Sequence, residues 1–348
     1  MTAEVLCRVE GHAAVLSLNR PGALHALNLN MVRLLTAELQ RLREQDAIRC
    51  VLLEHASGRG FCAGGDIRAL LDSVQNDGGQ SGRRFFYEEY QLDHLIGTYP
   101  KPVVAFMDGL TMGGGVGISL PASLRVVTER TRFAMPETGI GLFPDVGGGH
   151  YLSRLPQRLG RFLALTGTQL DGAECLWLGL GTHHVPGAAL PQLKAALAQA
   201  TEAPADVLRA HASAPPPARL AEHAARIART FASDRLEDVL QALAQDGSDW
   251  AVRVRQTVAE KSPQACKIAL RQLALGEQLP SLADDLRMEY RIASRVLVRP
   301  DFSEGVRAVI IDKDNAPRWS PATPEAVDEA LLDAIFAPLS AADEWRPL

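Results

Sequence analysis

Cysteines, aromatic residues and long apolar runs are all scarce in this sequence. Its 5 cysteines lie far apart and never form C-x-x-C, so neither a disulfide framework nor a zinc knuckle is indicated. No H-E-x-x-H occurs, and the adjacent pair His183-His184 would point to opposite sides of a strand, so we expect no metal site. No stretch reaches the ~18 unbroken apolar residues of a membrane span, so we expect no membrane segment.

A strong excess of charge is also missing. The 348 residues include 36 Lys and Arg against 41 Asp and Glu, which gives a formal net charge of −5. Nucleic-acid binders present a basic surface, so we expect no nucleic-acid partner. Residues Met1–Glu4 lead directly into an apolar/polar alternation and leave no room for a secretion signal. Together with the unpaired cysteines, this start predicts a cytoplasmic location.

A pattern of buried strand, glycine-rich loop and helix occurs twice. The apolar strand Cys50–Leu53 leads into the loop Ser57–Asp66, and the strand Val103–Phe106 leads into the loop Asp108–Gly117. A third buried strand, Leu124–Val127, follows. Repetition of a strand-strand-helix unit would wind the chain into a spiral.

Helical segments fill much of the remaining chain. Gln75–Arg84 is rich in Gly, Gln and Ser and is predicted to be flexible, with a helix from Phe85 to Ile96 behind it. From about Gln192 onward alanine-rich helical segments replace strands, and Pro215-Pro216-Pro217 interrupts them. We therefore predict an α/β fold in which residues 1–205 form the core and residues 206–348 form a helical C-terminal region that covers it.

The two glycine loops favour an oxyanion site. Neither G-x-x-x-x-G-K-[ST] nor G-x-G-x-x-G occurs, so a phosphate loop and a dinucleotide-dependent oxidoreductase are both poorly supported. If the two strands are neighbours, the amides of Gly65 and Gly114 could converge on one carbonyl oxygen, with no Cβ to hold the substrate away. The alternative is that these glycines only make tight turns.

Three carboxylates are candidates for the chemistry. Glu89 shares a helical stripe with Phe85, Leu92 and Ile96, and burying it without a partner would be costly, so it marks either a paired structural site or a functional one. Glu137 alone could be a solvated loop residue. Asp145 alone could be the N-cap of a helix that ends near residue 155.

Several segments resemble the enoyl-CoA hydratase/isomerase (crotonase) superfamily, and one of its branches, the 3-hydroxyisobutyryl-CoA hydrolases, matches best. The superfamily signatures are Asn19–Asn28 (NRPGALHALN), Gly60–Ile67 (GFCAGGDI) and Met112–Gly115 (MGGG). The branch signatures are Phe85–Tyr90 (FFYEEY), Phe133–Gly149 (FAMPETGIGLFPDVGGG) and Phe302–Ala308 (FSEGVRA). The resemblance covers nearly the whole chain and is least clear between about residues 192 and 260.

The resemblance implies a crotonase-like ββα spiral core and an acyl-CoA substrate. The implied reaction is hydrolysis of the 3-hydroxyisobutyryl-CoA thioester to 3-hydroxyisobutyrate and free CoA, a step of valine degradation. Coenzyme A would be part of the substrate, so no separate cofactor is expected. Members of this family commonly assemble through their C-terminal helices, so a homo-oligomer is one expectation, and packing of those helices on their own subunit is the other.

The resemblance also implies residue roles. Gly65 and Gly114 correspond to the oxyanion-hole amides, Glu137 to the principal catalytic carboxylate, and Asp145 and Glu89 to polar groups around the 3-hydroxyacyl end. The positions that line the CoA pocket in the family are Ala23, Leu24, Ala63, Asp66 and Ile67.

Two departures from the related hydratases argue against addition of water to an enoyl double bond. Hydratases carry a catalytic Glu where this chain has Gly117, and usually a glycine where it has Asp145. A hydratase or isomerase of the same fold and a non-catalytic acyl-CoA binder remain the alternatives. In a hydrolase, Glu137 could attack the thioester or activate water, and both routes stay open.

Overall fold

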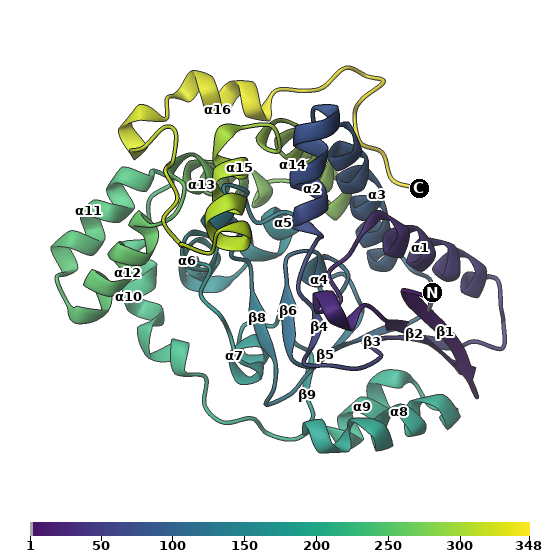
Figure 1. Ribbon diagram of the computed structural model, residues 1–348. Helices are drawn as coiled ribbons and strands as arrows, with labels where there is room; N and C mark the ends of the chain where they lie inside the picture. Colours follow the sequence, from purple (N-terminus) through teal and green to yellow (C-terminus); the bar gives the residue numbers. More distant parts are fainter. Residues whose placement is uncertain (1–2) are drawn as a thin grey trace.

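The computed structural model describes residues 3–348 and contains two β-sheets surrounded by helices (Figure 1). The larger sheet has 6 strands in the order β1-β2-β3-β5-β7-β9, and the smaller has 3 in the order β4-β6-β8. Among the named strands of this range, only β1 and β2 pair antiparallel. The strands are β1 (Val5–Glu10), β2 (Ala13–Leu18), β3 (Cys50–His55), β4 (Gly60–Cys62), β5 (Val103–Met107), β6 (Leu110–Met112), β7 (Leu124–Val127), β8 (Arg132–Ala134) and β9 (His183–His184).

From β3 onward, successive strands alternate between the two sheets, and this alternation produces the spiral. The pairs β3/β4, β5/β6 and β7/β8 each place their first strand in the larger sheet and their second in the smaller one. Helix α2 (Ile67–Asp77) follows β4, and helix α4 (Gly114–Gly117) follows β6. The predicted α/β class and the crotonase-like ββα spiral core are therefore confirmed, as are the three buried strands.

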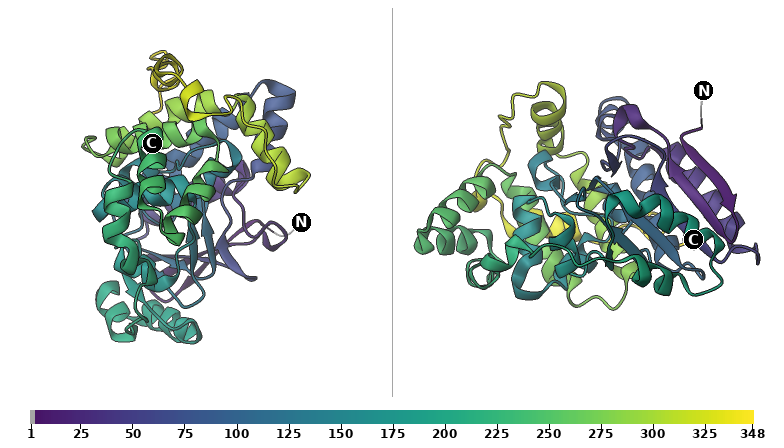
Figure 2. Two further views of the ribbon diagram at one scale, coloured as in Figure 1. Left: turned by 90° about the vertical axis from the view of Figure 1, so that its left-hand side faces the viewer. Right: turned by 90° about the horizontal axis from the view of Figure 1, so that it is seen from below.

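The central strands β2, β3 and β5 of the larger sheet are buried on both faces, as their continuous apolar sequences require, whereas the edge strand β1 is largely exposed. Alternate residues such as Val51 and Leu53 face the main core, whereas Cys50 and Leu52 face a second apolar layer. Helices α8 (Leu190–Gln199) and α9 (Pro204–His211) supply the other side of that layer. They lie together below the strands in Figure 1 and form a separate layer in Figure 2.

The prediction of a flexible segment over residues 75–84 is wrong. Helix α2 continues to Asp77, and helix α3 (Gln80–Gly97) begins after only two residues, Gly78 and Gly79. Both adopt left-handed backbone angles, with φ of 63° and 84°, which glycine reaches without a steric cost. The polar composition therefore marks a tight turn between two helices.

The C-terminal region is helical, as predicted, and part of it covers the core; the boundary at residues 205/206 stays a prediction. Helices α13 (Pro263–Gly276) and α14 (Leu282–Val296) pack against α5 (Gly148–Ser153) and lie next to it in Figure 1. Between residues 3 and 348 no helix is both long and apolar enough to cross a membrane. The helices of this region are α10 (Ala224–Thr230), α11 (Leu236–Asp246), α12 (Asp249–Ala259), α13 (Pro263–Gly276), α14 (Leu282–Val296), α15 (Pro300–Val306) and α16 (Glu329–Phe336).

The turn between β5 and β6 carries the chain from one sheet to the other and should not tolerate a side chain. Gly109 has a φ of +87°, and a Cβ there would lie 2.5 Å from the Arg59 carbonyl oxygen. We expect Gly109→Ala to lower the free energy of unfolding by about 2 kcal/mol or more, because strain and a backbone clash add. Gly22→Ala is the control, since nothing lies within 4 Å of that position. Equal urea midpoints for the two variants would contradict this prediction.

Candidate active site

The candidate site forms where the three strands of the smaller sheet end. Gly65 follows the last residue of β4 by three positions, Gly114 follows β6 by two, and Glu137 follows β8 by three. Because β4, β6 and β8 are parallel neighbours, their carboxyl ends meet at one edge of the sheet. Three residues that are far apart in the sequence are thereby brought together, as the glycine-loop argument predicted for two of them.

The amides of Gly65 and Gly114 are adjacent and free. A Cβ placed on Gly114 would lie 3.3 Å from the Gly65 nitrogen, so the two backbones are nearly in contact. Leu27 forms a β-bridge with Gly65 through the atoms of residues 64 and 66, which leaves the Gly65 N–H turned away from Leu27. Neither amide donates a hydrogen bond to any group between residues 3 and 348. These donors can therefore receive a ligand oxygen.

Glu137 is buried beside these amides, and no hydrogen bond or ion pair from another described residue offsets the cost of burying its carboxyl group. It begins a short 3-10 helix (Glu137–Ile140), and its Oε1 lies 3.2 Å from the position of a Cβ on Gly113. Its Oε2 finds no hydrogen-bond partner among the described residues. Burial, together with the negative charge of Asp145, raises the pKa of Glu137 well above the usual carboxyl value. The alternative of a solvated loop residue is therefore wrong.

Helix α3 delivers Glu89 to the same place. Glu89 is buried, and a Cβ on Gly114 would collide with its Oε1. That oxygen has no hydrogen-bond partner in the described part of the chain. The alternative that Glu89 belongs to a paired structural site is therefore not supported. Burial and the charges of Asp93 and Asp145 raise the pKa of Glu89 well above its ordinary value.

Asp145 is buried and receives a hydrogen bond of 2.8 Å from the Tyr90 hydroxyl. Burial raises the pKa of Asp145 to about 6, and the hydrogen bond from Tyr90 opposes this shift. The alternative role of Asp145 as a helix N-cap is wrong. Helix α5 starts after Gly147 without a side-chain cap from Asp145. The amides of Gly147 and Gly149 donate to Glu289 of α14, and the Gly148 amide donates to the Asp145 backbone carbonyl.

Asp93 is a fourth buried carboxyl that the sequence analysis missed. It lies one helical turn after Glu89 on α3, and neither of its oxygens has a partner within residues 3–348. Burial and the charge of Asp145 raise the pKa of Asp93 well above the normal range. The i,i+4 spacing from Glu89 was the available signal, since it places both acids on one face of the helix.

Two cavities that share lining residues lie at Gly65, and one of them also reaches Glu137. The inner cavity, of about 310 Å³, is lined by Gly65, Gly113 and Glu137, and also by Lys261 and Asn315 from the C-terminal region. No sequence pattern pointed to Lys261 or Asn315, because only the folded chain brings them to the site.

The outer cavity, of about 480 Å³, contains most of the positions expected to line a CoA pocket. Ala23, Ala63, Asp66 and Ile67 line it, and it shares Ala63, Gly65 and Ile67 with the inner cavity. Leu24 lines neither cavity, and its carbonyl oxygen accepts a hydrogen bond from the Ala63 amide at 3.0 Å. Leu24 therefore supports the loop before Gly65 through its backbone.

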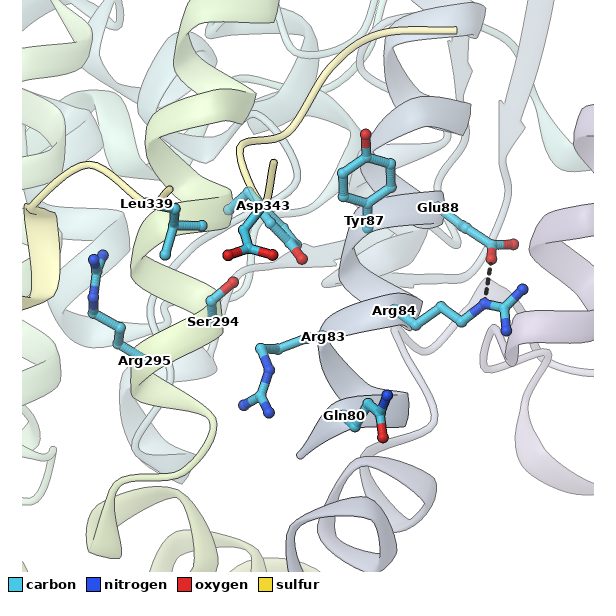
Figure 3. Close-up of a pocket in the computed structure, with 10 residues that line it drawn as sticks. Gln80, Arg83, Arg84, Tyr87, Glu88, Ser294, Arg295, Leu339 and Asp343 are labelled. Carbon is cyan, nitrogen blue, oxygen red and sulfur yellow. Dashed lines mark hydrogen bonds and ion pairs between the residues drawn. The ribbon is translucent and has the colours of Figure 1, made fainter. Parts of the chain in front are cut away.

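A further cavity, of about 580 Å³, lies between α3, α14 and the C-terminal segment (Figure 3). Its lining includes Arg83, Arg84, Tyr87 and Asp343, and Arg84 pairs with Glu88 inside it at 2.9 Å. None of the predicted site residues lines it. The candidate site is therefore the pair of cavities at the edge of the smaller sheet.

Comparisons with known proteins agree with this architecture. The family described as enoyl-CoA hydratase/isomerase matches residues 13–336. A curated relative from Xenopus tropicalis, "3-hydroxyisobutyryl-CoA hydrolase, mitochondrial", is 44% identical, with 98% of this chain and 90% of the relative aligned.

Two solved structures share the whole fold. One, described as a carnitinyl-CoA dehydratase from Mycobacterium thermoresistibile, is 40% identical with a TM-score of 0.94 over 99% of each chain. The other, an enoyl-CoA hydratase from Rhodobacter sphaeroides, is 35% identical with a TM-score of 0.92 over 99% of this chain and 100% of that one. The chain therefore belongs to the enoyl-CoA hydratase/isomerase family.

Proposed function

We propose that this protein hydrolyses the thioester of 3-hydroxyisobutyryl-CoA to 3-hydroxyisobutyrate and free CoA. Coenzyme A enters as part of the substrate, and the proposal requires no further cofactor. The observation that carries it is that two neighbouring free amides, Gly65 and Gly114, lie beside a buried and unpaired Glu137, and that Gly65 and Glu137 both line the inner cavity. The curated hydrolase that aligns over 98% of this chain supports the choice of substrate.

The two amides form the oxyanion hole in this proposal. The thioester carbonyl oxygen accepts hydrogen bonds from the N–H groups of Gly65 and Gly114. When the carbonyl carbon is attacked, this oxygen becomes an oxyanion, and each preorganised donor is worth on the order of 10²-fold in rate. The pantetheine arm leaves through the outer cavity past Ala63 and Ile67.

Glu137 forms the new bond or promotes it. In one route its carboxylate attacks the carbonyl carbon, CoA leaves as a thiolate, and water then opens the mixed anhydride. In the other route Glu137 removes a proton from water, and the resulting hydroxide attacks directly. Both routes break the C–S bond, add the oxygen of water to the acyl group and deliver a proton to the CoA sulfur.

Glu89 and Asp145 surround the 3-hydroxyacyl end. The raised pKa of Glu89 favours a protonated carboxyl, which can donate as well as accept a hydrogen bond with the substrate hydroxyl. The pKa of about 6 for Asp145 also suits proton transfer near neutral pH.

A second candidate is a dehydratase or hydratase, because the two solved structures carry those descriptions. The geometry at Gly117 favours hydrolysis. A Cβ at this position would lie 2.6 Å from the Val146 Cβ and 2.8 Å from Asp93 Oδ2. The second catalytic Glu that the resemblance places there in hydratases therefore has no room.

The fold does not determine where the protein is located in the cell or whether it forms oligomers. A cytoplasmic location and assembly into a homo-oligomer stay predictions, and the curated hydrolases are named mitochondrial. Cell fractionation and light scattering would decide them.

Release of free thiol tests the proposed reaction. We expect the protein to release CoA thiol from 3-hydroxyisobutyryl-CoA, and a parallel reaction with 3-hydroxypropionyl-CoA measures the contribution of the methyl group, about 1–3 kcal/mol at most. Methacrylyl-CoA serves as the hydratase substrate. Loss of its enoyl absorbance without thiol release would overturn the proposal in favour of a hydratase, and binding of all three without turnover would favour a non-catalytic binder.

Glu137→Gln removes the catalytic carboxylate but keeps the shape of the side chain. We expect kcat to fall by about 10³-fold or more, with little change in acyl-CoA affinity, because the amide can neither attack nor accept the proton. Glu174→Gln is a matched control, since Glu174 is also buried but serves in the capping box of α7 (Gly172–Trp177). Stopped-flow thiol release and calorimetry measure the two quantities. Near-normal turnover in Glu137→Gln would remove this residue from the mechanism.

The pH dependence of kcat/KM should report the repulsion between the charges of Glu137 and Asp145. Glu137 acts when ionised, so activity should rise with pH through its raised pKa. In Asp145→Asn the repelling charge is gone, the pKa of Glu137 falls, and the acidic limb of kcat/KM should move to lower pH. Glu88→Gln, on helix α3 and paired with arginines outside the site, should leave the limb in place. An unmoved limb in Asp145→Asn would show that Asp145 does not act on Glu137 electrostatically.

A further inference from the structure

The loop that carries Asp145 has a strained backbone, which needs contacts from other parts of the chain to maintain it. Val146, the next residue, has a φ of +54°, a left-handed conformation that is unfavourable for a β-branched side chain. Within the loop, the Gly148 amide donates to the Asp145 carbonyl oxygen at 2.8 Å. Such strain, of order 1–3 kcal/mol, persists only where surrounding groups enforce it.

Glu289 of α14 holds one side of this loop. Its side chain is fully buried; Oε2 accepts from the Gly147 amide at 2.7 Å, and Oε1 accepts from the Gly149 amide at 2.9 Å. One carboxyl group therefore fixes Gly147, which directly follows Val146, and Gly149, two residues further on.

Gln272 of α13 holds the other side. Its Nε2 donates to the Pro144 carbonyl oxygen at 2.7 Å and to Glu289 Oε1 at 2.8 Å. Both hydrogens of the side-chain amide are therefore used. One bonds to Pro144, the residue before Asp145, and the other bonds to Glu289, which holds Gly147 and Gly149. Gln272 is also fully buried, so water does not compete for these bonds.

We propose that Glu289 and Gln272 form a clamp that positions Asp145 for the reaction. Neither residue lines the inner or the outer cavity, so they are positioning residues that act through the backbone. The clamp makes the helical C-terminal region part of the catalytic apparatus, since α13 and α14 pack against α5 at the end of this loop (Figure 1). The effect of the clamp on kcat rests on the proposed hydrolysis.

A purely structural role makes a different prediction. If these buried groups only stabilised the fold, replacing them would lower the unfolding temperature and leave kcat of the folded protein unchanged. If they position Asp145, kcat falls in folded protein and KM changes little, because the cavities that bind the thioester and CoA are untouched.

Glu289→Gln combined with Asp145→Asn tests the coupling. Three N–H groups converge on the two oxygens of Glu289, and Gln offers only one oxygen, so at least one donor faces another donor. We expect kcat to fall about 10- to 100-fold in Glu289→Gln, with KM changed less than about threefold. In the Asp145→Asn background the same substitution should cost less than about twofold. Equal losses in both backgrounds would overturn the clamp.

Gln272→Leu and Gln264→Leu form a matched pair on α13. Both glutamines are fully buried, but Gln264 accepts a hydrogen bond from Arg299 and does not contact the loop. We expect Gln272→Leu to reproduce the kcat loss of Glu289→Gln and Gln264→Leu to keep kcat within about twofold of the parent. Equal kcat values in the two variants, with both folded by circular dichroism, would overturn the proposal.

Hydrogen exchange separates the clamp from the reaction. The amides of Gly147 and Gly149 should exchange faster in Glu289→Gln and Gln272→Leu, and at the parent rate in Gln264→Leu. Unchanged exchange in the first two variants would overturn the clamp. If the parent protein released no thiol from any acyl-CoA, the proposed function would fail, and these exchange rates would still decide whether the clamp exists.

Discussion

The backbone pairing of three short strands is the constraint on which the candidate site depends. Strands β4, β6 and β8 are held in register as parallel neighbours, so the residues that follow them must emerge at one edge. Because each strand alternates with one of the larger sheet, the core that buries the larger sheet also fixes this edge. Gly65, Gly114 and Glu137 thus owe their proximity to hydrogen bonds made several residues away.

The second constraint is electrostatic. Glu89, Asp93, Glu137 and Asp145 are all buried, and no arginine or lysine lies within ion-pair distance of any of them among the described residues. Like charges removed from water cannot all ionise, so protons stay on some of these groups near neutral pH. An acyl-CoA substrate brings an ester-like carbonyl and a hydroxyl, which are neutral groups that a partly protonated site can receive without adding another uncompensated charge.

The C-terminal helices do more than cover the spiral. Lys261 and Asn315 line the inner cavity. Glu289 and Gln272 form hydrogen bonds with the backbone on both sides of Asp145. The same contacts explain why Glu289 and Gln272 are tolerated in the buried parts of α14 and α13, since both satisfy backbone groups around the strained turn at Val146. The fold and the site are therefore parts of one packing arrangement.

The sequence by itself determined the three buried strands, the helical last third and the glycines that free two amides, because hydrophobic periodicity and missing side chains are local properties. The stripe on α3 marked Glu89 in the same way. Local pattern was misleading where packing decides the outcome. Residues 75–84 contain a tight turn between two helices and not a flexible segment. At the start of α5, the side chain that accepts a backbone hydrogen bond is Glu289 and not Asp145. Only the tertiary structure brought Lys261, Glu289 and Gln272 to the site, because side-chain pairing across distant segments leaves no period in the sequence.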